Sequence, residues 1–183
     1  MSNSFAPGFL IAMPDLGDPE FFRSVVLLCS HDEQGAFGLV LNNPSNMAVA
    51  DICEQTEIEW NGSEEILAHI GGPVEPGNGW VIHRGENSYE DSQRVAPNLY
   101  ISASQGALRA YADDPTGDYL LCLGYAGWGA GQLEAELASG SWITSAVSPT
   151  LIYGTEPHLL WRLALAEVGI NVANLVSGNS HIN

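Results

Sequence analysis

Lysine is absent from this chain. Among its 183 residues only five side chains are basic, against 22 acidic ones, which gives a formal net charge of −17. The basic residues are all arginines, and they are scattered along the sequence: Arg23, Arg84, Arg94, Arg109 and Arg162. Nucleic-acid binding draws most of its affinity from basic side chains that neutralise phosphates. The composition therefore disfavours direct nucleic-acid binding, and solubility explains the acid excess.

Long apolar stretches and cysteine are also scarce. The longest apolar stretches, such as Leu159 to Ala166, are much shorter than the roughly 18 residues that cross a bilayer. The N-terminus lacks the basic region of a signal peptide, so we expect no membrane contact and a cytoplasmic location. The three cysteines, Cys29, Cys53 and Cys122, are odd in number and lie among apolar neighbours. That setting favours buried, reduced thiols over disulfides.

With 45% hydrophobic residues, the chain is long enough for one domain with a substantial core, and we expect a single domain over residues 1–183. The apolar patterns predict strands at residues 9–13, 25–29, 38–41, 66–70, 80–83, 99–103, 119–123 and 142–147. Helices are predicted at 49–55, 105–112 with Ser104 as N-cap, 131–138, and from an N-cap at Thr155 to Gly169. The last helix is apolar almost all round, which predicts that it is largely buried.

These elements alternate without a strict strand–helix–strand rhythm. The order predicts an α+β fold, with a mixed or mainly antiparallel sheet flanked by helices, rather than a doubly wound sheet. Such a sheet can curl towards a barrel, and the sequence leaves that option open.

A glycine-rich segment, Gly124 to Glu134 (GYAGWGAGQLE), stands between a predicted strand and a predicted helix. It lacks the Lys of a phosphate-binding Walker loop and the G-x-G-x-x-G of dinucleotide folds. Two interpretations remain. Gly127, Gly129 and Gly131 can supply the dihedrals of a tight turn, while Tyr125 and Trp128 cover the core. Alternatively, Trp128 beside bare backbone can hold a flat or anionic ligand.

A second glycine-containing segment, Gly71-Gly72-Pro73-Val74, either rims the same pocket or simply connects two strands. Near the N-terminus, Asp15, Asp18 and Glu20 lie close in sequence to Arg23, an arrangement that favours an ion pair over a catalytic site.

No metal site is expected. Cys29 and His31 have ligand-like spacing, but the sequence shows no third ligand.

Several stretches form a pattern over nearly the whole chain: Phe9 to Leu16 with Asp18-Pro19, Arg23 to Val25, Gly35 to Pro44, Gly71 to Val74, Leu123 to Glu134, and Trp142. In order and spacing they resemble the bacterial YqgE/AlgH family. The resemblance implies a single cytoplasmic α+β domain and, from the AlgH name, a transcriptional regulator connected with alginate production. It implies no reaction. One departure is Gly77-Asn-Gly-Trp80, where the family usually has Asp-Arg-Gly-Phe, so an arginine is missing there.

The sequence therefore favours a non-catalytic binding or regulatory module, without a cofactor, that acts through a protein or small-molecule partner. Because the chain is so acidic, regulation through a partner is favoured over direct contact with DNA. The alternative is a hydrolase that uses Asp15 or Glu134 as acid or base. The candidate binding surface comprises Asp15, Arg23, Gly71, Gly72, Pro73, Gly124, Tyr125, Gly127, Trp128, Gly129, Gln132 and Glu134.

Overall fold

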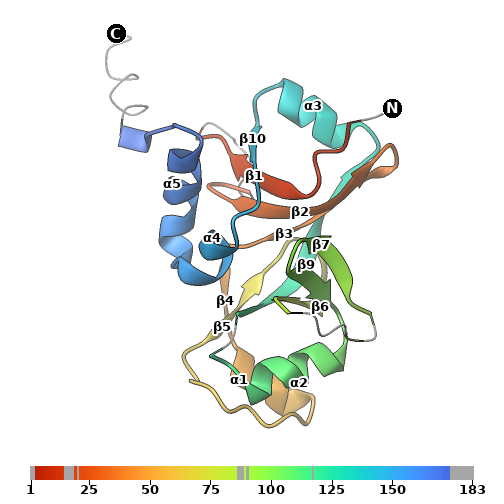
Figure 1. Cartoon of the computed structure of the whole chain (residues 1–183), viewed down its shortest axis with the longest axis vertical. Helices are drawn as coiled ribbons and strands as arrows, with labels where there is room; N and C mark the ends of the chain where they lie inside the picture. The colour runs from red at the N-terminus through yellow and green to blue at the C-terminus, as the bar shows by residue number, and fades with distance from the viewer. Residues whose placement is uncertain are drawn as a thin grey trace.

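A computed structural model describes residues 3–14, 19, 21–85, 89, 91–116 and 118–173 (Figure 1). Its longest strand, β9 (Tyr119–Gly129), organises the fold. One half of β9 pairs antiparallel with β3 (Gly35–Val40), and the other half pairs antiparallel with β6 (Val74–His83) and parallel with β5 (Leu67–Ile70). A single strand thus joins the two parts of the sheet.

The sheet runs in the order β10-β1-β2-β3-β9-β6-β8-β7, with β4 and β5 attached beside β9. The remaining strands are β1 (Gly8–Ala12), β2 (Val25–Asp32), β4 (Pro44–Ala48), β7 (Gln93–Ala96), β8 (Leu99–Ser102) and β10 (Trp142–Ser145). All pairs except β5–β9 are antiparallel. The predicted α+β class is confirmed. The sheet does not close into a barrel, because β10 and β7 are its two ends.

Helices cover the sheet in three places (Figure 1). Helices α4 (Pro149–Gly154) and α5 (Pro157–Glu167) pack on one face of β1 and β2, and α3 (Gln132–Ala138) packs on the opposite face. Helices α1 (Val49–Gln55) and α2 (Gln105–Asp113) cover the other part of the sheet. Strand β1 is therefore buried on both faces, since Phe9 and Ile11 face α5 whereas Leu10 and Ala12 face α3. No helix within the described residues is long and apolar enough to cross a membrane.

Several predicted details are confirmed and others are wrong. Helix α1 has the predicted bounds, and the Ser104 hydroxyl accepts a hydrogen bond from the N–H of Ala107, as an N-cap does. The cysteines are free thiols, as predicted, with Cys53 and Cys122 buried and Cys29 half-buried. Helix α5 begins one residue later than expected, with Glu156 as N-cap, and it is not largely buried. Its Leu159 and Leu163 are 41% and 43% exposed, because only one face packs on the sheet.

Candidate functional site

The two glycine-containing segments meet in space. The N–H of Gly71 donates to the carbonyl of Leu123 at 2.7 Å, and Val74 pairs with Tyr125 across β6 and β9. Their backbones pass so closely that a Cβ on Gly72 would lie 2.1 Å from the carbonyl carbon of Tyr125. A Cβ on Gly124, which has φ of +71°, would lie 2.5 Å from the Gly72 oxygen. The glycines here permit a backbone crossing.

The GYAGWG segment is strand rather than turn, which corrects the prediction from its glycines. Gly127 and Gly129 are extended residues of β9, and only Gly131, with φ of +76°, makes the turn into α3. Trp128 is only 6% exposed, and its ring lies against Phe21 and Trp142. The indole N–H donates to a carboxylate oxygen of Glu136 at 3.3 Å. The face of Trp128 is therefore covered by protein.

The last two predicted residues of this segment also have internal partners. The Gln132 side chain accepts a hydrogen bond from the N–H of Gly129 at 3.0 Å, which ties α3 to the end of β9. Glu134 bonds the Nε2 atom of His31. His31 Nδ1 accepts from the N–H of Phe5 at 3.0 Å, so Nε2 carries the proton that is donated to Glu134. That bond lowers the pKa of Glu134, whereas a general acid needs a raised one.

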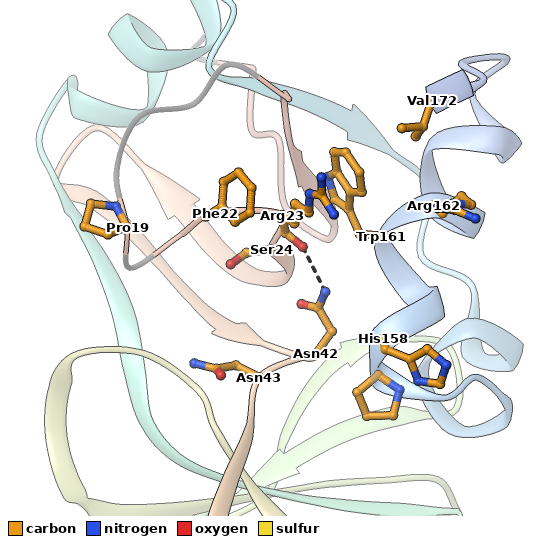
Figure 2. Close-up of a pocket in the computed structure, with 11 residues that line it drawn as sticks. Pro19, Phe22, Arg23, Ser24, Asn42, Asn43, His158, Trp161, Arg162 and Val172 are labelled. Atoms are coloured by element: carbon orange, nitrogen blue, oxygen red, sulfur yellow. Dashed lines mark hydrogen bonds between the residues drawn. The ribbon is translucent and has the colours of Figure 1, made fainter. Parts of the chain in front are cut away.

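A different part of the molecule contains an open cavity of about 470 Å³, between the segment before β2 and helix α5 (Figure 2). This volume lies in the usual range for small-molecule sites. Two of the five arginines, one histidine, two asparagines and two aromatic rings line it: Arg23, Arg162, His158, Asn42, Asn43, Phe22 and Trp161. No carboxylate is among the described residues of the wall.

Arg23 is held in place by an unusual backbone. Its φ of +55° lies in the left-handed region, which costs free energy for any residue except glycine. The Asn42 side chain fixes this conformation. Its Nδ2 donates to the Arg23 carbonyl at 2.9 Å (Figure 2), and its Oδ1 accepts from the N–H of Val25 at 2.9 Å. The Arg23 guanidinium lies 5.0 Å from the ring centre of Phe22 and 5.1 Å from that of Trp161. The guanidinium is thereby oriented before any ligand arrives.

The opposite wall adds further positive charge. Helix α5 begins at Pro157, so the positive end of its dipole lies at the cavity. Arg162 projects from the same helix, one residue after Trp161, whose indole N–H donates to the carbonyl of Ala12 at 2.7 Å. Within the described part of the chain, neither Arg23 nor Arg162 lies within ion-pair distance of a carboxylate. The described wall of the cavity therefore carries two arginines, and a described carboxylate beside it, Glu156, lies 3.4 Å from Nδ1 of His158.

Comparison with known proteins identifies the family. A sequence model described as AlgH-like matches residues 9–173. The chain belongs to the AlgH-like family. It is 39% identical over 176 residues to a UPF0301 protein of Myxococcus xanthus, which covers 96% of this chain and 97% of the relative. A UPF0301 protein of Vibrio cholerae is 37% identical, covering 94% of this chain and 96% of that protein.

Solved structures agree. The solution structure of the AlgH protein from Pseudomonas aeruginosa superposes with a TM-score of 0.78 at 38% identity, covering 96% of this chain and 95% of that one. A crystal structure of a Corynebacterium diphtheriae protein gives a TM-score of 0.71 at 21% identity, with 91% and 88% coverage. The second likeness shows the shared fold alone. The family resemblance predicted from the sequence motifs is confirmed.

The predicted binding surface of this AlgH-like chain is divided by the structure. Arg23 lines the large cavity, and Gly72 and Pro73 line a smaller one of about 240 Å³ that shares Pro19 and Asn43 with it. Asp15 lies outside the described residues. The other two acids near Arg23 in the sequence, Asp18 and Glu20, also lie outside them, so the predicted ion pair stays a prediction. The remaining predicted residues lie at the strand crossing, in the β3–β9 pairing or at the contact with α3: Gly71, Gly124, Tyr125, Gly127, Trp128, Gly129, Gln132 and Glu134.

Sequence reasoning missed three important residues of the cavity, Asn42, Trp161 and Arg162. The sequence did contain one signal, the Arg162 charge inside an otherwise apolar helix next to Trp161. Tryptophan and arginine are enriched among the residues that contribute most to binding, but the apolar pattern of this helix predicts a place in the core.

A buried serine–histidine pair belongs to the core of the AlgH-like fold. His83 and Ser102 are both fully buried, and His83 Nε2 lies 2.8 Å from the Ser102 hydroxyl oxygen. The Ser102 hydroxyl also lies 2.7 Å from that of Ser92, which accepts from the N–H of Tyr89. Burial lowers the pKa of His83. The chain of hydrogen bonds satisfies buried polar groups and leaves no side open to a substrate.

Proposed function

We propose that this protein is a cytoplasmic, non-catalytic binding module, and that its ligand is a small molecule with an anionic group that binds between Arg23 and Arg162. The observation that carries the proposal is the arrangement of Arg23. A strained, left-handed arginine is fixed by Asn42 and stacked on Trp161 at an open cavity. Strain of this kind persists where the surrounding structure enforces it, and it concentrates at functional sites.

Charge supports an anion as the ligand. A net charge of −17 repels anions from the surface as a whole, so a cavity walled by two arginines and a helix N-terminus is the favoured place for one to bind. Arginine binds carboxylate and phosphate in a fork geometry, and its charge-assisted hydrogen bonds are the strong ones. Phe22, which is 55% exposed, supplies flat apolar surface beside the charge.

Regulation is the role that fits a binding module of this kind. A bound ligand would bridge α5 and the segment before β2, and a protein partner would then bind the surface that these two segments form together. The net charge also supports this route over direct contact with DNA. The hydrolase alternative loses support at Glu134, whose carboxylate is bonded to His31 and whose pKa is lowered.

Titration calorimetry with inorganic phosphate tests the proposal. We expect Arg162→Gln to weaken binding by roughly ten- to a hundredfold, because a charge-assisted hydrogen bond contributes about 1.5–3 kcal/mol. Arg109→Gln is the matched control, since it removes the same charge from the exposed face of α2, away from the cavity. That control should bind within about twofold of the unaltered protein. Equal weakening in both variants, or no binding by the unaltered protein, would overturn the anion site.

A further inference from the structure

A second cavity of about 440 Å³ lies on the other side of the same walls. Asn42 and Asn43 line the first cavity, whereas Leu41 and Pro44, on either side of them, line the second. On the other wall, Pro157 lines both cavities, while Leu160 faces the second and Trp161 the first. Residues 41–44 and the first turns of α5 therefore separate two neighbouring spaces.

The second cavity differs from the first in chemistry. Its wall is mainly apolar and aromatic, with Leu41, Tyr111, Tyr119, Ile152, Tyr153 and Leu160 among its residues. Neither arginine nor lysine is among its described residues, and the one carboxylate, Glu65, belongs to an exposed residue.

The three tyrosines and the histidine of this wall are uncharged at neutral pH. Burial raises the pKa of Tyr111 and of Tyr119 to about 12, and it raises the pKa of Tyr153 as well. Burial lowers the pKa of His69. This space suits an uncharged apolar group.

Two residues that line the second cavity, Tyr153 and His69, carry a polar atom without a hydrogen-bond partner among the described residues. The hydroxyl oxygen of Tyr153 is buried, and no described residue is its hydrogen-bond partner. His69 donates from Nδ1 to the carbonyl of Leu41 at 2.6 Å, so Nε2 of the neutral ring is left as an acceptor. The Tyr153 hydroxyl is enclosed within the wall, so Nε2 of His69 is the acceptor left for a ligand in this space.

We propose that the second cavity holds the uncharged, apolar part of the ligand whose anionic group binds in the first cavity. The ligand class is then a soluble anionic amphiphile, such as a monoalkyl phosphate or a medium-chain carboxylate. This inference rests on the proposed anion site, because the arginines supply the anchor from which the apolar part reaches over Pro157, the residue that lines both cavities.

A series of ethyl, butyl and hexyl phosphates, titrated by calorimetry, tests the inference. Each methylene that enters the second cavity should increase affinity roughly fourfold, as burial of one methylene does. Leu67→Trp fills this cavity from a position that is 39% exposed, so the fold should tolerate it. We expect that variant to bind inorganic phosphate normally and to lose the dependence on chain length. Met47→Trp is the matched control, because Met47 is also 39% exposed and lies outside the cavity wall.

The outcomes separate the two proposals. Phosphate binding without any gain from the alkyl chain overturns the second subsite and leaves the anion site standing. If affinity still rises with alkyl length in Leu67→Trp, the alkyl group binds outside the second cavity, and the inference is overturned. Absence of binding by every phosphate overturns both proposals. Hexanol binding as tightly as hexyl phosphate, unaffected by Arg162→Gln, makes the second cavity an independent site. Binding to vesicles of anionic lipid but to none of the soluble esters contradicts the soluble ligand.

Discussion

The Asn42 side chain bonds to the backbone on both sides of Ser24, the residue that directly follows the strained Arg23. It donates to the Arg23 carbonyl and accepts from the N–H of Val25, both at 2.9 Å. Val25 is fully buried, so its N–H has no access to water. One amide therefore satisfies a buried donor and fixes the direction of an arginine that faces the cavity.

Asn42→Ala should lower the free energy of unfolding by about 2–3 kcal/mol, because a buried N–H is left without a partner. Urea unfolding measures the loss, and phosphate titration of the folded variant should show weaker binding. Asn78→Ala is the control, since its side chain bonds only Glu75 on an exposed surface and should change stability by less than about 0.5 kcal/mol. An Asn42→Ala variant as stable as the Asn78 control would contradict the assigned role.

Gly72→Ala tests the strand crossing. Its Cβ would lie 2.1 Å from backbone atoms of Tyr125, which no rotamer change can relieve. We expect a loss of roughly 3 kcal/mol or more, or failure to fold. Gly77→Ala in β6 has nothing within 4 Å of the new Cβ, so it should be nearly neutral. Thermal unfolding of both variants decides the matter, and equal melting temperatures would show that the crossing tolerates a side chain.

The His31–Glu134 contact predicts a pH dependence. The hydrogen bond to His31 lowers the pKa of Glu134 below its ordinary 4.5. A lowered carboxyl pKa stabilises the fold above the unfolded-state pKa, and this contribution is lost as pH falls through the folded-state pKa. Glu134→Gln should thus be less stable than the unaltered protein at pH 6, and the difference should shrink below about pH 4.5. Urea unfolding from pH 3 to 7 measures it; a difference that grows on acidification would reverse the sign.

Tyr153→Phe should stabilise the unliganded protein, raising its unfolding free energy by about 1 kcal/mol. The hydroxyl that it removes is buried, with no partner in the described chain, and an unpaired buried hydroxyl costs free energy. Ser102→Ala provides the contrast, because the Ser102 hydroxyl contacts both His83 and Ser92, and its removal should cost about 1–3 kcal/mol. Equal losses in the two variants would mean that Tyr153 has a partner in solution.

The elements that the sequence predicts best are those whose signals are local. Helix α1 follows from its apolar spacing, and the start of α2 follows from Ser104, whose hydroxyl caps the first turn. The last part of β9 was missed because glycine is depleted in strands. Gly124 is needed there because it crosses Gly72, and nothing local to either residue reveals that contact.

The cavity was hard to predict for the same reason. It brings together Arg23, near the start of the chain, and Trp161 on the last helix. Asn42, which fixes the Arg23 backbone, lies in the short connection between β3 and β4. The acids near Arg23 in the sequence draw attention to this arginine. Its stacking on Trp161 is a long-range contact, which no local pattern predicts. Trp128 misled for the opposite reason, since a tryptophan among glycines suggests an open ring, whereas Phe21 and Trp142 cover it.

The most direct test of the central claim is an NMR titration of the isotope-labelled protein with inorganic phosphate, observing arginine Nε–H, asparagine side-chain and tryptophan indole signals. The account predicts saturable shifts at Arg23, Arg162, Asn42 and Trp161, with Arg94 and Arg109 unmoved. Shifts spread evenly over all five arginines, or confined to Arg94 and Arg109, would contradict a built anion site between Arg23 and Arg162.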